Sequence, residues 1–230
     1  MADKNKEQAG VNLEIDQTIN KAEGYISENK KSISIIGGAI LVVILGYFGY
    51  TNLIVQPQEE SAQKEIFMAE RYFQQDSVEK ALNGDGQFMG FLEIIDSYGS
   101  SNSANLAHYY SGMCYMKKGE WDNAIEYLSN YDAEDDITGA LALGAMGDAN
   151  LELGKKDEAE NFYMKAVDWD KNQFTAAIYL MKAAFVKELL NDYKGAAVLY
   201  ERIKKDYPKS TEARDIERYI VRANAMATQG

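Results

Sequence analysis

The sequence predicts an all-α protein in which one membrane-spanning helix precedes a solenoid of stacked helical hairpins. Three observations support this prediction: an uncharged run of 23 residues, a pattern of Gly, Ala and Tyr that returns after 35 and 37 residues, and only two prolines. A chain of 230 residues has room for one large or two small domains. We expect a tail (1–32), a transmembrane signal-anchor helix (33–55), an N-terminal divergent helical pair (56–103), three helical repeats (104–208), and a C-terminal capping helix with a tail (209–230).

The composition excludes several classes of protein. The chain carries 24 Lys and Arg against 36 Asp and Glu, a net charge of −12, which argues against a nucleic-acid binder. Cys114 and His108 are the only residues of their kinds, so neither a disulfide framework nor a Cys- or His-rich metal cage can form. We find no phosphate-binding loop and no Ser-His-Asp set, and therefore expect no catalytic site, no metal and no cofactor.

The anchor is predicted from the run Ile33–Val55, which contains no charged residue. About 20 apolar residues cross a hydrocarbon core of roughly 30 Å as a helix. A buried soluble helix is the alternative, and a cleaved signal peptide is disfavoured because no A-x-A cleavage site follows the run. Tyr47 and Tyr50 lie near its end, where aromatic side chains settle at a membrane interface.

Lys30 and Lys31 precede the run, whereas an acidic stretch follows it, so the positive-inside rule places residues 1–32 in the cytoplasm and residues 56–230 across the membrane. The translocated part then carries a net charge of −11. Within the run, small residues recur along one helical face, as in membrane helices that pack closely on a partner; ordinary glycine scatter is the alternative. These residues are Ser34, Gly38, Gly46 and Gly49.

Three segments after residue 104 repeat one another. The alanines at 124, 159 and 196 correspond, and each follows a Gly or Asn at 119, 154 or 191 by five residues. This order of small, aromatic and turn residues is typical of the 34-residue tetratricopeptide unit, a pair of antiparallel helices A and B. Gly119, Gly154 and Asn191 are predicted to end helix A in a left-handed conformation, and Gly112 and Gly147 to lie where helix A crosses helix B.

Other helices are predicted on both sides of the repeats. Before them we expect helices over 58–75 and 88–98 with a turn at 84–86, and after them a capping helix over 211–223 with Ser210 as its N-cap. His108 and Cys114 are expected to be packing residues.

Stacked hairpins present a surface lined by their A helices, and this surface is the predicted partner-binding site. We expect Met113 and Phe185 on it to take no part in repeat packing. Contact with the terminal helices of the same chain is the alternative role of such residues. The partner-binding residues are Tyr109, Met113, Met116, Leu141, Met181 and Phe185, with Leu106, Gly144, Asp148, Leu151, Ile178 and Glu188 also facing inward.

This organisation resembles the YfgM-like ancillary subunits of the bacterial SecYEG translocon. The resemblance covers the chain from Val11 to Ala223 and includes the repeat residues and the closing segment 213–219. It implies an inner-membrane protein with a periplasmic domain that associates with SecYEG and with the membrane-anchored periplasmic prolyl isomerase chaperone PpiD. It would assist the handover of exported polypeptides. The alternative is a structural adaptor in another envelope assembly, such as outer-membrane assembly, secretion or cell-wall machinery.

Overall fold

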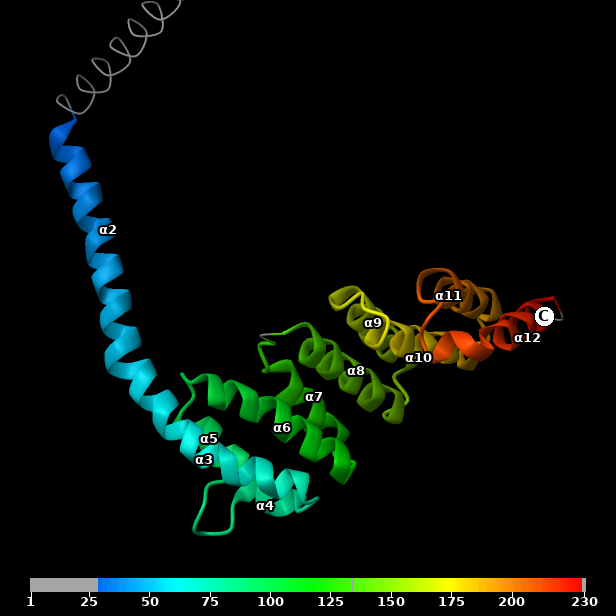
Figure 1. Ribbon diagram of the computed structural model, residues 1–230, viewed down its shortest axis with the longest axis horizontal. Coiled ribbons are helices and arrows are strands. Elements are labelled where there is room, and N and C mark those ends of the chain that lie inside the picture. The colour runs from blue at the N-terminus through cyan, green and yellow to red at the C-terminus, as the bar shows by residue number, and fades with distance from the viewer. Residues whose placement is uncertain (1–28, 134, 229–230) are drawn as a thin grey trace, which may run out of the picture. The chain divides into compact units, whose positions relative to one another are not determined.

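The computed structural model describes residues 29–133 and 135–228, all of whose regular structure is helical. The chain divides into two units between Gln56 and Pro57. The expectations for residues 1–28 lie outside the described residues. Figure 1 labels the helices in chain order.

In the N-terminal unit, the described residues 29–56 form one helical stretch. It comprises α2 (Lys30–Tyr50) followed by a π-helical turn, η1 (Thr51–Val55). The apolar side chains of α2 from Ile35 onward are exposed, and none of them has a partner in the core clusters of the C-terminal unit. Within the described part of the chain, the stretch that includes α2 is the one that is long and apolar enough to cross a membrane, judged by length and composition.

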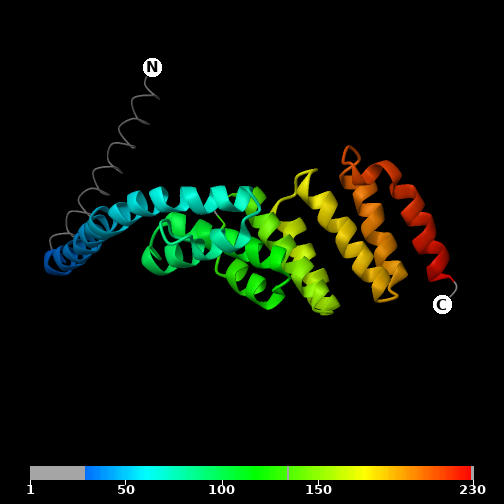
Figure 2. The ribbon, with the colours of Figure 1, turned by 90° about the horizontal axis from the view of Figure 1, so that it is seen from below.

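The C-terminal unit consists of consecutive helices. They are α3 (Gln56–Gln74), α4 (Val78–Asn83), α5 (Phe91–Ser97), α6 (Asn102–Lys118), α7 (Trp121–Ser129), α8 (Asp136–Glu152), α9 (Lys156–Trp169), α10 (Thr175–Leu189), α11 (Tyr193–Asp206), the 3-10 turn η2 (Glu212–Asp215) and α12 (Ile216–Ala227). Figure 2 shows α9 to α12 side by side, each packed on its neighbour in the chain. Helices α6 and α7, α8 and α9, and α10 and α11 form three hairpins.

The same turn ends helix A in each hairpin. Gly119, Gly154 and Asn191 have φ of 73°, 73° and 60°, which confirms the predicted left-handed residues. The N–H of the next residue then donates to the carbonyl five positions back, at 3.0, 2.9 and 2.8 Å. This bond satisfies a carbonyl that would otherwise be unpaired at the end of the helix. Helix B begins two residues after the left-handed residue in each hairpin.

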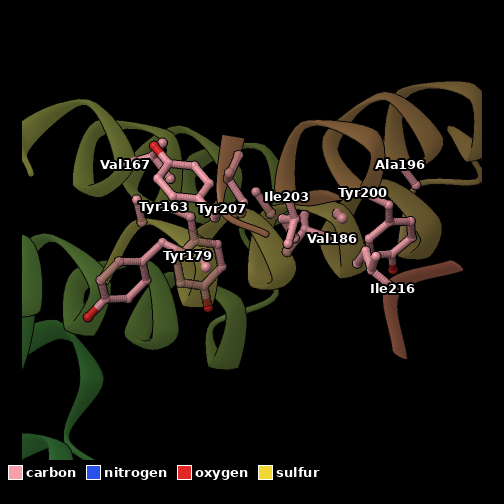
Figure 3. Packing of buried hydrophobic residues seen from close by; sticks show 14 of the residues in the cluster. Tyr163, Val167, Tyr179, Val186, Ala196, Tyr200, Ile203, Tyr207 and Ile216 are labelled. Atoms are coloured by element: carbon pink, nitrogen blue, oxygen red, sulfur yellow. The ribbon is translucent and has the colours of Figure 1, made fainter. Parts of the chain in front are cut away.

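Buried residues of α8 to α12, with Tyr207 between α11 and η2, form the largest core cluster among the described residues (Figure 3). Tyr163 of α9 stacks on Tyr179 of α10, with ring centroids 6.3 Å apart and planes inclined by 14°. Tyr200 of α11 lies at the other end of the cluster and is fully buried. Alanines fill the helix crossings between these rings, so adjacent backbones approach closely.

A second core cluster lies under α3, α4 and α5. Ile66 and Ala69 of α3 pack with Phe91 of α5 and with Ala107 and Cys114 of α6. Helix α4 was not expected from the sequence, and α5 is shorter than the helix predicted over 88–98. The capping helix also differs from the prediction, because η2 forms its first turn and α12 continues to Ala227. Ser210 Oγ accepts a hydrogen bond from Ala213 N–H at 3.1 Å, as an N-cap does.

Candidate partner-binding surface

The A helices α6, α8 and α10 carry the residues that the sequence places on the partner-binding surface. In α6, Tyr109, Met113 and Met116 are half-buried and pack on a cluster that includes Leu128 of α7 and Met146 of α8. The expectation that Met113 takes no part in repeat packing is therefore wrong. The thioether side chains fill the joint between the first and second repeats, for which flexible Met is well suited.

The second repeat contributes little open surface. Gly144 of α8 is buried, and a Cβ atom added to it would lie 2.0 Å from Cε1 of Tyr179. The backbone of α8 thus approaches the ring of Tyr179, on the next A helix α10, too closely for any side chain at position 144. Leu141 is half-buried on the same helix.

An apolar stripe on the third repeat is the most exposed part of the surface. Five apolar side chains follow one another at intervals of three or four residues, from the N-cap residue of α10 to its last residue, which places them on one side of the helix. We call them the α10 stripe: Phe174, Ile178, Met181, Phe185 and Leu189. Phe174 is 71% exposed, Leu189 52% and Phe185 39%. Sequence reasoning missed Phe174 and Leu189, although their spacing from Phe185 indicates this face.

Both ends of the α10 stripe have defined neighbours. Phe185 makes edge-to-face contacts with Tyr200 and with Tyr219 of α12, at centroid distances of 6.4 and 5.8 Å. The contact with Tyr200 lies within the third repeat, so the expectation that Phe185 takes no part in repeat packing is wrong. The contact with Tyr219 is the alternative role, packing on a terminal helix of the same chain. At the other end, Phe174 and Ile178 line a pocket of about 220 Å³ whose wall includes Lys209 and Glu212.

Two groups of side chains, each a tyrosine, a carboxylate and a cation, link α8 to α10 and α10 to α12; we call them the inter-repeat triads. In the first, Asp148 of α8 accepts a hydrogen bond from Tyr163 OH at 2.6 Å and pairs with Lys182 Nζ of α10 at 2.7 Å. In the second, Glu188 of α10 accepts from Tyr200 OH at 3.1 Å and from Arg222 of α12 at 2.7 Å. The two triads repeat the same geometry one hairpin apart.

The triads leave their tyrosines protonated. Burial, and next the hydrogen bond to Asp148, raise the pKa of Tyr163. Burial and the charge of Glu188 raise the pKa of Tyr200 in the same way. A phenol whose pKa is raised is a hydrogen-bond donor at neutral pH, so these groups hold the helices together and offer no base.

The other residues that the sequence singles out, Cys114, His108 and the small residues of α2, are not part of the predicted partner-binding surface. Cys114 is fully buried, and burial raises the pKa of its thiol to about 12, so it is protonated and unreactive. His108 is half-buried beside the ring of Tyr127. In the part of the chain that the structure describes, no three His, Cys, Asp or Glu side chains converge as metal ligands would. Ser34, Gly38, Gly46 and Gly49 lie along α2, and an added Cβ at these glycines would meet nothing within 4 Å.

The comparisons with known proteins concern the repeats. Sequence profiles of the tetratricopeptide repeat match residues 106–133, 140–173 and 179–210. No curated protein sequence matches the chain.

Solved structures show the same fold. Two crystal structures of nearly identical TPR-like repeats, from a Podosopora anserina protein described as a kinesin light chain, match with TM-scores of 0.53 at 14% identity. They cover 73% of this chain and 86% and 87% of their own. The crystal structure of MamA matches with a TM-score of 0.50 at 17% identity, over 70% of this chain and 95% of that chain. The chain therefore contains tetratricopeptide repeats, and its C-terminal unit has the all-helical fold of a tetratricopeptide solenoid, which is typical of non-catalytic scaffolds of protein interactions.

Proposed function

We propose that the chain is a non-catalytic scaffold, anchored in a bacterial inner membrane, that binds partner proteins through the α10 stripe. One observation carries the proposal: an exposed row of Phe, Ile, Met and Leu on a helix whose opposite face is packed in the core. Contiguous apolar side chains of this kind mark interaction sites in soluble domains. The fold supplies the rigid support that such a surface needs.

The aromatic side chains of the α10 stripe are suited to dominate an interface. Phe174 is 71% exposed and thus has most of its area to bury on binding. Aromatic anchors seated in a partner commonly provide most of the binding energy, while the residues around them exclude water. Ile178 and Met181 are half-buried between the two phenylalanines and would extend the apolar contact. A partner's amphipathic helix or extended apolar segment has the chemistry to cover this row.

The membrane topology follows from the anchor. We place residues 1–32 in the cytoplasm and residues 56–230 in the periplasm, because Lys30 and Lys31, in the first turn of α2, precede an uncharged run that is not followed by a cleavage site. Protease added to spheroplasts should digest the C-terminal unit and spare a small N-terminal fragment. If the C-terminal unit is protected in intact spheroplasts and digested only after lysis, the orientation is the opposite of the one proposed.

The partners we propose are the SecYEG translocon and the membrane-anchored periplasmic prolyl isomerase chaperone. The support is the resemblance of the anchor, repeats and capping helix to YfgM-like subunits. In this arrangement the scaffold would stay beside the translocon and pass exported polypeptides to periplasmic chaperones.

Purification from membranes in mild detergent tests the scaffold. The test variant combines Phe174→Glu with Leu189→Glu, since both side chains are more than half exposed and tolerate replacement without loss of core packing. The control combines Val198→Glu with Val221→Glu, two equally exposed apolar residues outside the α10 stripe. We expect the translocon and the isomerase to co-purify with wild type and the control, and the isomerase to be lost from the test variant. Equal recovery of the isomerase with both variants would exclude the α10 stripe as its binding site. Recovery of outer-membrane or cell-wall proteins in place of the translocon would favour an adaptor of another envelope assembly.

A further inference from the structure

A pocket of about 400 Å³ opens where α3 and the first turns of α6 and α8 meet. Its wall combines Glu59 of α3, Ser103 and Leu106 of α6, and Asp135 and Thr138 at the start of α8. Leu106 is one of the inward residues of the first repeat, so the pocket continues the surface formed by the A helices. It lies at the opposite end of the repeats from the α10 stripe in chain order.

The carboxylate of Glu59 is fixed at the pocket wall by neutral donors. It accepts hydrogen bonds from Ser103 Oγ at 2.8 Å, from Ser103 N–H at 3.1 Å and from Gln63 Nε2 at 2.9 Å. Burial raises the pKa of Glu59, but the hydrogen bonds from Ser103 and its neighbours outweigh burial, so the pKa lies below 4.5. Glu59 is thus ionised at neutral pH.

Asp135 is held in the same way on the other side of the pocket. It is the N-cap of α8, and its Oδ1 accepts from the N–H groups of Ile137 and Thr138 at 2.9 and 2.8 Å. The hydrogen bond from Thr138 Oγ1, followed by those from the backbone, lowers the pKa of Asp135. Tyr131 OH in turn contacts Thr138 Oγ1 at 2.7 Å, which fixes this wall.

No cation balances these two charges within the described residues. The ion pairs there involve other carboxylates, such as Asp148 with Lys182 and Glu188 with Arg222. Glu59 and Asp135 receive hydrogen bonds only from neutral groups. Carboxylate oxygens bind charged donors more strongly than neutral ones. The pocket therefore has unused affinity for a cation.

The rest of the lining selects an organic cation with an apolar stem. Ile66 is buried at the pocket, and Leu106 and Tyr131 are half-buried there. The alkyl stem of Lys or Arg packs on surfaces of this kind while its charged head stays near carboxylates. The ring of Tyr131 adds an attractive face for a cation.

The distribution of charge along the chain favours the same ligand. Residues 57–138 carry five Lys and Arg against 16 Asp and Glu, a net charge of −11. Residues 139–230 carry 14 of each and are neutral. The net negative charge of the C-terminal unit thus lies entirely in the segment that builds the pocket. Such a field attracts positively charged partners and repels acidic ones.

We propose that this pocket binds a Lys or Arg side chain from a basic segment of a partner protein. The inference rests on the proposed scaffold function and names the chemistry of one partner segment. The side chain would place its charged head between Glu59 and Asp135 and its stem on Leu106 and Tyr131. The C-terminal unit would then have two contact points, an apolar one on α10 and an acidic one where α3, α6 and the start of α8 meet.

Fluorescence anisotropy with the full chain in detergent tests the pocket. The probe is a fluorescein-labelled peptide in which Arg alternates with Ala, and the same peptide with Gln in place of Arg is the comparison. The test variant combines Glu59→Gln with Asp135→Asn, which removes two charges while Asn still serves as an N-cap. The control combines Glu93→Gln with Asp96→Asn, two exposed residues of α5 in the same acidic segment. It changes the net charge equally and leaves the pocket intact.

We expect the test variant to weaken binding of the Arg peptide about tenfold and the control about twofold or less, because only the former removes charge-assisted hydrogen bonds. Should the double variant not fold, Asp135→Asn alone is expected to weaken binding about threefold. Equal affinity of wild type for the Arg and Gln peptides would overturn the pocket. Equal weakening of Arg-peptide binding by the test and control variants would also overturn it, because binding would then depend on the overall negative charge of the segment and not on the pocket.

The outcomes separate this pocket from the scaffold itself. If Phe174→Glu with Leu189→Glu loses partners but Glu59→Gln with Asp135→Asn keeps wild-type peptide affinity, the scaffold stands and the pocket is wrong. If the former retains partners while the latter loses the peptide, the pocket stands and the α10 stripe is wrong.

Discussion

Two glycines control how closely the two helices of the first and second hairpins approach each other. A Cβ atom added to Gly112 would lie 2.5 Å from Cγ of Leu128, and one added to Gly147 would lie 2.5 Å from Cε1 of Tyr163. The predicted close crossing of helices A and B is thereby confirmed at both positions. Tyr163 cannot move aside readily, since it is buried and its hydroxyl is bonded to Asp148.

Gly147→Ala should therefore destabilise the protein. Alanine in place of glycine in a helix normally gains up to about 1 kcal/mol, whereas overpacking costs about 1–3 kcal/mol. We expect a net loss, measured as a lower midpoint of thermal unfolding followed by circular dichroism in detergent. Asn161→Ala, at an exposed position of α9, should leave the midpoint unchanged or raise it. A Gly147→Ala protein at least as stable as wild type would refute the close crossing.

His108 is expected to make stability depend on pH near neutrality. Burial lowers its pKa below 6.5, and its Nδ1 has no hydrogen-bond partner among the described residues. The unfolded chain then binds a proton more readily than the folded protein, so stability is unaffected above about pH 6.5 and falls as pH decreases below it. His108 is the only histidine in the sequence. His108→Gln should flatten the unfolding free energy between about pH 7 and about pH 5.5, and an unchanged slope would contradict this assignment.

Short-range patterns explain which residues could be predicted. The left-handed residues at 119, 154 and 191 and the glycines of the crossings act within one hairpin, so their spacing is visible in the sequence. The exposure of Phe174 and Leu189 and the burial of Met113 depend on which neighbouring helix covers them. Their exposure therefore depends on contacts between helices that are distant in the sequence, which the residue spacing within a single repeat does not reveal.

Among the elements, the two inter-repeat triads join α8 to α10 and α10 to the capping helix α12. Asp148 and Lys182 are each about one-third exposed, so solvent screens their attraction. The triads therefore contribute more to the fixed spacing of α8, α10 and α12 than to overall stability. In each triad the cation follows the carboxylate by 34 positions in the sequence.

A double-mutant cycle on Asp148→Asn and Lys182→Met measures the first triad. We expect a coupling free energy of about 0.5–1 kcal/mol, because the pair is partly exposed but aligned by Tyr163. High salt should reduce it. The matched cycle on Asp122 and Lys155, an exposed pair at 3.7 Å, should give a value near zero. Equal coupling in both cycles would show that Tyr163 does not organise the pair.

Helix α4 shows why some elements could not be predicted. It has six residues, too few for an apolar period to be visible. The segment after it folds back so tightly that a Cβ added to Gly90 would lie 2.2 Å from the carbonyl oxygen of Leu82. Asp85 accepts hydrogen bonds from the N–H groups of Gln87 and Phe88, which delays the start of α5 to Phe91. The path of the chain between α4 and α5 is set by these backbone contacts, which leave no periodic pattern of apolar residues in the sequence.

At the scale of the whole molecule, the chain joins an apolar helix to a repeat domain with two contrasting ends. Residues 57–138 carry all of the domain's net negative charge, and α10 carries its exposed apolar row. A partner that is basic at one point and apolar at another would match both. The anchor would hold this surface at a membrane and thereby raise its effective concentration toward other membrane proteins.

Photo-crosslinking in living cells tests the central claim, that the α10 stripe contacts a partner protein. A photoreactive amino acid would replace Phe185 or Phe174 on the stripe, and Val198 of α11 as the control, in otherwise wild-type chains. We expect discrete protein adducts from the two stripe positions and none from Val198. Adducts of equal yield from all three positions, or from Val198 alone, would contradict a partner-binding surface on the A helices.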